Sequence, residues 1–149
     1  MSKCLLKEIN AVGFVARKDA LFWQTMLQKA NQIIMTFTTN LDIHFVEAGL
    51  GRQTVYCLVD SGAMISCISR NVLQNCLPNA KIFNSRLTSI TGVCGETHPV
   101  LGETSISLRL GDLELRQNFT ILGTLHAKVI LGIDFIRSHK VKTDFGEMT

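Results

Sequence analysis

Apolar and polar residues alternate along much of the chain from about residue 41 onward, which is the pattern of strands with one buried face. Glycine-containing turns separate these short runs, and little of the region has helical spacing. This combination predicts an all-β barrel or sandwich. The expected strands are 41–45, 54–59, 65–68, 87–91, 97–101, 105–110, 113–115, 119–122 and 141–145.

Turns and short helices separate these strands. Glycine-rich segments at 47–51 and 92–96 read as the turns of two hairpins, and Gly111-Asp112 reads as a third turn. Ser69 can cap a short helix that Pro78 would stop. A further helical turn is expected over 135–139.

Residues 1–40 show a different pattern. Asp19 can cap a helix over 20–35, where apolar residues recur at helical spacing and form one stripe. We therefore divide the chain into an N-terminal helical extension, 1–40, and a domain over 41–149. The extension would be a linker or the remnant of an upstream polyprotein segment. The stripe consists of Phe22, Met26, Ala30, Ile33 and Ile34, widened by Trp23 and Leu27.

One apolar run ends in an acid. Residues 55–63 read Val-Tyr-Cys-Leu-Val-Asp-Ser-Gly-Ala, so a buried strand would deliver Asp60 to its end. Ser61 can hydrogen-bond backbone groups, Gly62 permits a sharp turn, and Ala63 leaves room beside the acid. An ordinary strand followed by a solvated aspartate would contain the same residues, so this motif alone does not decide the function.

A second apolar run, Lys-Val-Ile-Leu-Gly-Ile-Asp-Phe-Ile at 128–136, is expected to form another strand that ends in Gly132 and runs into a short helical turn. This second stretch shifts the interpretation of the first toward a functional site. Together the two stretches resemble the retropepsins, the aspartic proteases of retroviruses and long-terminal-repeat retrotransposons. The second stretch looks most like the gypsy type of retrotransposon protease. The resemblance covers about 41–145 and implies a closed retropepsin-like barrel, the acid protease fold, with one lobe per chain.

The resemblance also implies residue roles. Asp60 would be the catalytic acid, and Ser61, Gly62 and Ala63 would support the catalytic loop. The hairpin with its tip at 92–96 would be the flap that closes over the substrate. The substrate-binding residues expected on this basis are Val93, Cys94, Gly95, Ile130, Leu131 and Gly132.

Hydrolysis of a peptide by carboxylates needs two acids that share one proton: one acts as a base toward water, and the protonated one donates to the carbonyl oxygen. In aspartic proteases the two carboxyl groups lie about 3 Å apart, and at this distance they do not both ionise. The chain has one Asp-Ser-Gly-Ala, and Asp134 is not followed by a hydroxyl and a glycine. It is expected to cap a helical turn or pair with a basic side chain. One chain would therefore hold half a site, and the expected assembly is a symmetric homodimer with Asp60 of each subunit on the twofold axis. Water is the nucleophile, so no cofactor and no metal is expected.

Charge and composition argue against other functional classes. The net charge is +3 with scattered basic residues, so no nucleic-acid contact is expected, and no apolar run is long enough for a membrane span. The five cysteines are odd in number and no two are spaced Cys-x-x-Cys. The cysteines are therefore expected to be reduced thiols, and the protein is expected to be intracellular, in the cytoplasm or in retroelement particles. The four histidines lack metal-ligand spacing.

The sequence therefore favours an aspartic endopeptidase that acts on a polypeptide substrate, a retroelement polyprotein. One alternative is a catalytically silent or domesticated retropepsin-like module that dimerises or binds peptides. Another is the protease domain of a cellular protein of the ubiquitin-shuttle type. The intact residues 60–63 argue against loss of activity.

Overall fold

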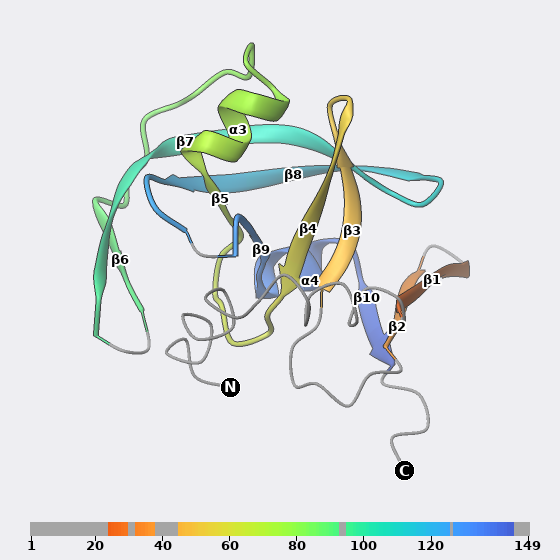
Figure 1. The fold of residues 1–149 in the computed structure, drawn as a ribbon. Helices are drawn as coiled ribbons and strands as arrows, with labels where there is room; N and C mark the ends of the chain where they lie inside the picture. The colour runs from red at the N-terminus through yellow and green to blue at the C-terminus, as the bar shows by residue number, and fades with distance from the viewer. Residues whose placement is uncertain (1–23, 30–31, 38–44, 93–94, 126, 145–149) are drawn as a thin grey trace, which may run out of the picture.

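The computed structural model describes residues 24–29, 32–37, 45–92, 95–125 and 127–144. Strands dominate this part of the chain, as the alternating pattern predicts (Figure 1). The elements are β1 (Gln24–Lys29), β2 (Gln32–Phe37), β3 (Phe45–Leu50), β4 (Gln53–Val59), β5 (Cys67–Ser69), α3 (Arg70–Cys76), β6 (Ser89–Thr91), β7 (Thr97–Leu110), β8 (Leu113–Leu122), β9 (Val129–Leu131), α4 (Ile133–Ser138) and β10 (Val141–Asp144).

The main sheet closes into a barrel. Its strand order is β3-β4-β9-β5-β8-β7-β6, and a pairing of Gly49 on β3 with Arg109 on β7 joins the two ends of the ring. Strand β6 stays outside the ring and pairs with the outer part of β7. The closed barrel that the resemblance implies is therefore confirmed.

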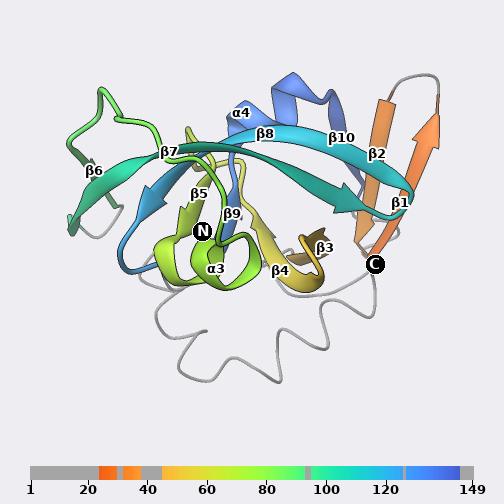
Figure 2. The same cartoon turned by 90° about the horizontal axis from the view of Figure 1, so that it is seen from above.

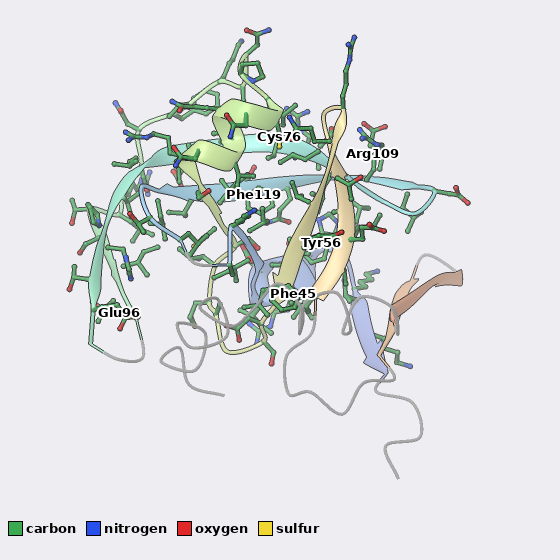
Figure 3. The ribbon with its side chains drawn as sticks, viewed as in Figure 1. Phe45, Tyr56, Cys76, Glu96, Arg109 and Phe119 are labelled. Carbon is green, nitrogen blue, oxygen red and sulfur yellow. The ribbon has the colours of Figure 1, made fainter. Side chains whose placement is uncertain are left out.

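The barrel core follows the period of two. On β7, Ile106 and Leu108 are buried while their neighbours face outward, and on β8 the ring of Phe119 is buried among them (Figure 3). Each such apolar side chain contributes about 1.5–3 kcal/mol when fully buried. This packed interior gives the loops at the barrel end a rigid base.

Two short helices pack on the barrel. Helix α3 begins after Ser69, whose Oγ accepts a hydrogen bond from the Val72 amide at 3.2 Å, and buries Leu73 in the core. It ends before Pro78, as expected. Helix α4 begins at Ile133, two residues earlier than the expected helical turn. Neither of the helices in the described part of the chain is long and apolar enough to cross a membrane.

The expected helix over 20–35 is wrong wherever the structure describes that segment. Strands β1 and β2 form an antiparallel pair there, and β2 also pairs in parallel with β10. The resulting three-stranded sheet lies on the opposite side of the barrel from the β6–β7 hairpin (Figures 1 and 2). The antiparallel pairing of β1 with β2 and the parallel pairing of β2 with β10, far along the chain, together override the local helical spacing. The division at residue 40 stays a prediction.

The turn of the first hairpin is also shifted from its expected position. Strand β3 continues to Leu50, and the chain turns at Gly51 and Arg52 rather than over 47–51. Gly51 has a φ of +62°, a conformation that glycine adopts without strain. Residues 41–44 of the expected first strand lie outside the described residues.

Candidate active site

The loop after β4 holds the half-buried Asp60 at the end of the barrel. The Asp60 amide donates a hydrogen bond to the Leu131 carbonyl at 3.0 Å, which ties the loop to β9. The Gly62 amide donates to Asp60 Oδ1 at 2.9 Å, and the Ala63 amide donates to the Asp60 carbonyl at 3.1 Å. The chain turns sharply after Asp60, as the Asp-Ser-Gly-Ala motif predicts, and the backbone of this turn orients the carboxylate.

Gly132 packs directly beneath this loop. Strands β4 and β9 run parallel with Val59 beside Leu131, and the Ile133 amide donates to the Ala63 carbonyl at 2.7 Å. A Cβ at position 132 would lie 2.7 Å from the carbonyl oxygens of both Ala63 and Ile65. Only glycine allows this close approach of two backbone segments.

A polar network behind the loop was not identified from the sequence. The hydroxyl of Ser66 donates to Asp134 Oδ1 at 2.7 Å and accepts from the Gly132 amide at 3.0 Å. The Ser66 amide donates to Asp134 Oδ2 at 3.1 Å, and Gln117 Nε2 lies 3.4 Å from that oxygen. Asp134 also accepts from the amide of Phe135 and lies in the first turn of α4, but Gly132 occupies the cap position and the partners of Asp134 are polar, so the described residues show neither the expected cap nor the expected basic partner.

A cavity of about 480 Å³ opens beside the Asp60 loop. Gly62 and Ala63 form one edge, Ile130 of β9 lies on its floor, and Ile90 of β6 lies on the hairpin side. Glu96 and His98 of the same hairpin add polar groups, with 3.9 Å between Glu96 Oε1 and His98 Nε2. The hairpin and the Asp60 loop extend toward the same side of the molecule (Figure 1), so the cavity joins them.

The predicted loop residues occupy two kinds of position. Ser61 and Gly62 are exposed at the turn, whereas Ala63 is buried against Phe45 and Ile130. Gly132, predicted as a substrate-binding residue, is instead buried beneath them and is not among the residues that line the cavity. The structure thus brings these residues together around Asp60.

The predicted substrate-binding residues divide differently. Ile130 lines the cavity, but Leu131 is 0% exposed and faces the barrel core, so of the two expected roles, lining or supporting the cleft, Leu131 can have only the supporting one. Consecutive strand residues point to opposite faces, which is the reason. Gly95 lies at the hairpin tip with a φ of +82°, while Val93 and Cys94 lie outside the described residues.

Metal-binding and thiol chemistry receive no support from the described residues. No three His, Cys, Asp or Glu side chains gather there in a way that would hold a metal ion. Cys57 and Cys67 are buried, and burial raises the pKa of the Cys57 thiol well above its usual value. Cys67 lies at the cavity wall. We therefore treat both as small apolar residues.

A barrel with one such aspartate loop defines the retropepsin-like fold, and comparison with known proteins agrees. The family model for aspartyl proteases matches residues 36–144, and this chain belongs to that family. The EIAV protease complexed with the inhibitor HBY-793 has a TM-score of 0.58 and 18% identity, covering 70% of this chain and 96% of that chain. The retroviral protease-like domain of Ddi1 from Leishmania major has a TM-score of 0.53 and 18% identity, covering 67% of this chain and 77% of that chain. At these identities the similarity shows the fold.

His139 extends the polar network toward the end of α4. Its Nε2 lies 3.1 Å from Gln117 Oε1. Its ring packs against the ring of the buried Phe135, with 4.7 Å between the two ring centroids. Burial lowers the pKa of His139 below 6.5, although a hydrogen bond to the Arg116 backbone and the charge of Asp134 oppose this shift. The folded protein therefore favours the neutral imidazole.

We expect this histidine to make stability depend on pH. Because its folded pKa is lowered, the unfolded chain binds the proton more readily, so its contribution to stability is complete above pH 6.5 and decreases as pH falls below that value. His139→Gln should therefore reduce the loss of thermal stability between about pH 7 and pH 5. Melting temperatures of both proteins across this range measure the effect, and parallel profiles would contradict it.

Proposed function

We propose that this chain is an aspartic endopeptidase that acts as a homodimer. The observation that carries the proposal is that the loop holding Asp60 is fastened to β9 and lines, through Gly62 and Ala63, an apolar cavity that the β6–β7 hairpin borders. Asp60 of each subunit would meet at the twofold axis, and Ser61 would brace the two loops across it.

The chemistry needs one ionised and one protonated carboxyl. The ionised Asp60 would take a proton from water while the protonated one donates to the peptide carbonyl oxygen. Asp134 is a poor second acid within the same chain, because both of its carboxylate oxygens accept hydrogen bonds from Ser66. The second acid is therefore expected from another copy of this chain.

A polypeptide fits the cavity as substrate. The cavity lining is mostly apolar, and two apolar side chains at its edge are well exposed, Met64 at 79% and Leu87 at 44%. Exposed apolar groups beside a hollow mark a binding surface. The hairpin would act as a flap, with Val93, Cys94 and Gly95 over the substrate backbone.

The natural substrate proposed here is a retroelement polyprotein, processed inside the cell or in retroelement particles. Its support is the resemblance of residues 128–136 to gypsy-type proteases. The structural neighbours include a viral protease and a protease-like domain of a cellular protein. The fold alone therefore fits more than one biological setting, and the substrate has to be tested directly.

Sedimentation combined with a cleavage assay tests this function. We expect a dimer that cleaves an unstructured peptide at about pH 5, where one acid of such a pair stays protonated, and that pepstatin inhibits. A dimer that binds peptide without cleaving it would instead favour the catalytically silent module. A monomer with full activity would overturn the homodimer.

A further inference from the structure

We propose that Ser66 and Asp134 are positioning residues for the Asp60 loop: they fix its far end to the Gly132 turn and so set the direction of the catalytic carboxylate. This inference rests on the proposed function and deepens it. It adds two side chains that touch neither the cavity nor the reacting groups, and whose effect passes through the backbone.

Ser66 joins three segments at one buried point. Its side chain is 1% exposed, and its hydroxyl both donates to Asp134 and accepts from the Gly132 amide. Its carbonyl accepts a hydrogen bond from the Thr120 amide of β8 at 3.0 Å. Replacing such a hydroxyl leaves the Gly132 amide without its acceptor, which costs more than the bond itself contributes.

Asp134 fixes Ser66 from the other side. Its two oxygens accept from the Ser66 amide and hydroxyl, a two-point contact that sets the orientation of residue 66 as well as its position. Gln117 on β8 lies against the same carboxylate, and its own amide also donates to the Asn118 carbonyl at 2.9 Å. The contact is thereby anchored to a central barrel strand.

The loop between Asp60 and Ser66 depends on few attachments. Its near end is tied by the hydrogen bond from the Asp60 amide to Leu131, and its middle by the bond from Ile133 to Ala63. Both partners flank Gly132, whose own amide bonds to Ser66. The Gly132 turn therefore receives all three attachments, and loosening the Ser66 attachment frees the turn that holds the other two.

The kinetics of Ser66→Ala test the positioning role, and Ser69→Ala is the matched control. Ser69 lies three residues further along, is also buried, and also has a hydrogen-bonded hydroxyl, but it caps α3 instead of contacting Gly132. We expect Ser66→Ala to lower kcat about 10- to 100-fold with KM nearly unchanged, because misplacement of a catalytic group by about 1 Å costs this much. Ser69→Ala should lower the melting temperature yet retain kcat.

Ser66→Thr, which keeps the hydroxyl, should recover most of the lost kcat. If Ser66→Ala does not fold, Asp134→Asn answers the same question, since an amide cannot accept both bonds from residue 66. Equal losses of kcat in Ser66→Ala and Ser69→Ala would overturn the inference, because they would show a general effect of stability.

Hydrogen exchange separates this inference from the proposed function. In Ser66→Ala the Gly132 amide loses its acceptor and should exchange at least about tenfold faster, whereas Ser69→Ala should leave its rate unchanged. This readout does not require a cleavable substrate. Wild-type protein without peptidase activity would refute the proposed function, while unchanged exchange at Gly132 in Ser66→Ala would refute the positioning role.

Discussion

Replacing Asp60 by asparagine is expected to lower kcat for peptide cleavage by at least about 10³-fold, because general acid and base catalysis are both lost in each subunit of the proposed dimer. Asparagine is close in size to aspartate, and its side-chain oxygen can still accept the hydrogen bond from the Gly62 amide. The loop should therefore keep its shape while it loses the group that ionises. Initial rates of peptide hydrolysis measure the effect, and sedimentation shows whether the dimer persists.

Asp112→Asn provides the control for this substitution. Asp112 is exposed in the turn between β7 and β8, so its replacement changes the net charge by the same amount without touching the Asp60 loop. Its kcat should equal that of the wild type. Wild-type cleavage by Asp60→Asn would show that another group performs the reaction.

Gly132→Ala is expected to have the largest effect on the fold around the site. A methyl group there would lie 2.7 Å from two carbonyl oxygens and 2.8 Å from the Ile65 carbonyl carbon, and all three are backbone atoms that cannot rotate away. We expect a loss of about 1–3 kcal/mol in the free energy of unfolding, as for other overpacked sites. Because the loop must move to make room, kcat should fall at least about tenfold.

Gly123→Ala is the matched control, since a Cβ at position 123 would lie 3.6 Å from Leu101 Cδ1, an ordinary van der Waals contact. Denaturant unfolding of both variants should show a change within about 0.5 kcal/mol for Gly123→Ala, as for most surface positions. If Gly132→Ala were as stable as the wild type, the Asp60 loop would be able to move away from the added methyl group without cost, which would contradict this prediction.

The parts of the fold that depend on local chemistry were predictable. The run ending at Asp60 forms β4 and its loop, Ser69 caps α3, and Gly111 turns the chain between β7 and β8 with a φ of +58°. In each case a residue type has a conformational or hydrogen-bonding property that acts within a few positions. The barrel itself followed from the alternation and from the resemblance.

Most features that the sequence did not predict depend on partners that lie far along the chain. Ser66 and Asp134 are 68 residues apart, so no local pattern indicates that they bind one another. The apolar stripe before residue 36 fits a helix on its own, but the segment forms the β1–β2 hairpin, and the distant strand β10 completes that sheet by pairing in parallel with β2. A buried serine two residues before Ile68 was the available signal, since a buried hydroxyl needs a partner.

Strand β7 shows a third kind of miss. The sequence divides it into strands at 97–101 and 105–110, but the structure contains one strand from Thr97 to Leu110. A shift in register between Val100 and Gly102 absorbs the irregularity, and Gly102 adopts a φ of +151° there. The bulge lets one strand serve both the hairpin and the barrel.

The attachment of the Asp60 loop to β9 and α4 has a consequence for the order of synthesis. Asp60 leaves the ribosome some seventy residues before the segment that holds it in place. A nascent chain shorter than about residue 134 carries the acid but lacks the hydrogen bonds that Leu131, Gly132 and Asp134 contribute. The Asp60 loop can therefore take up its folded position only after the chain has been translated through Asp134.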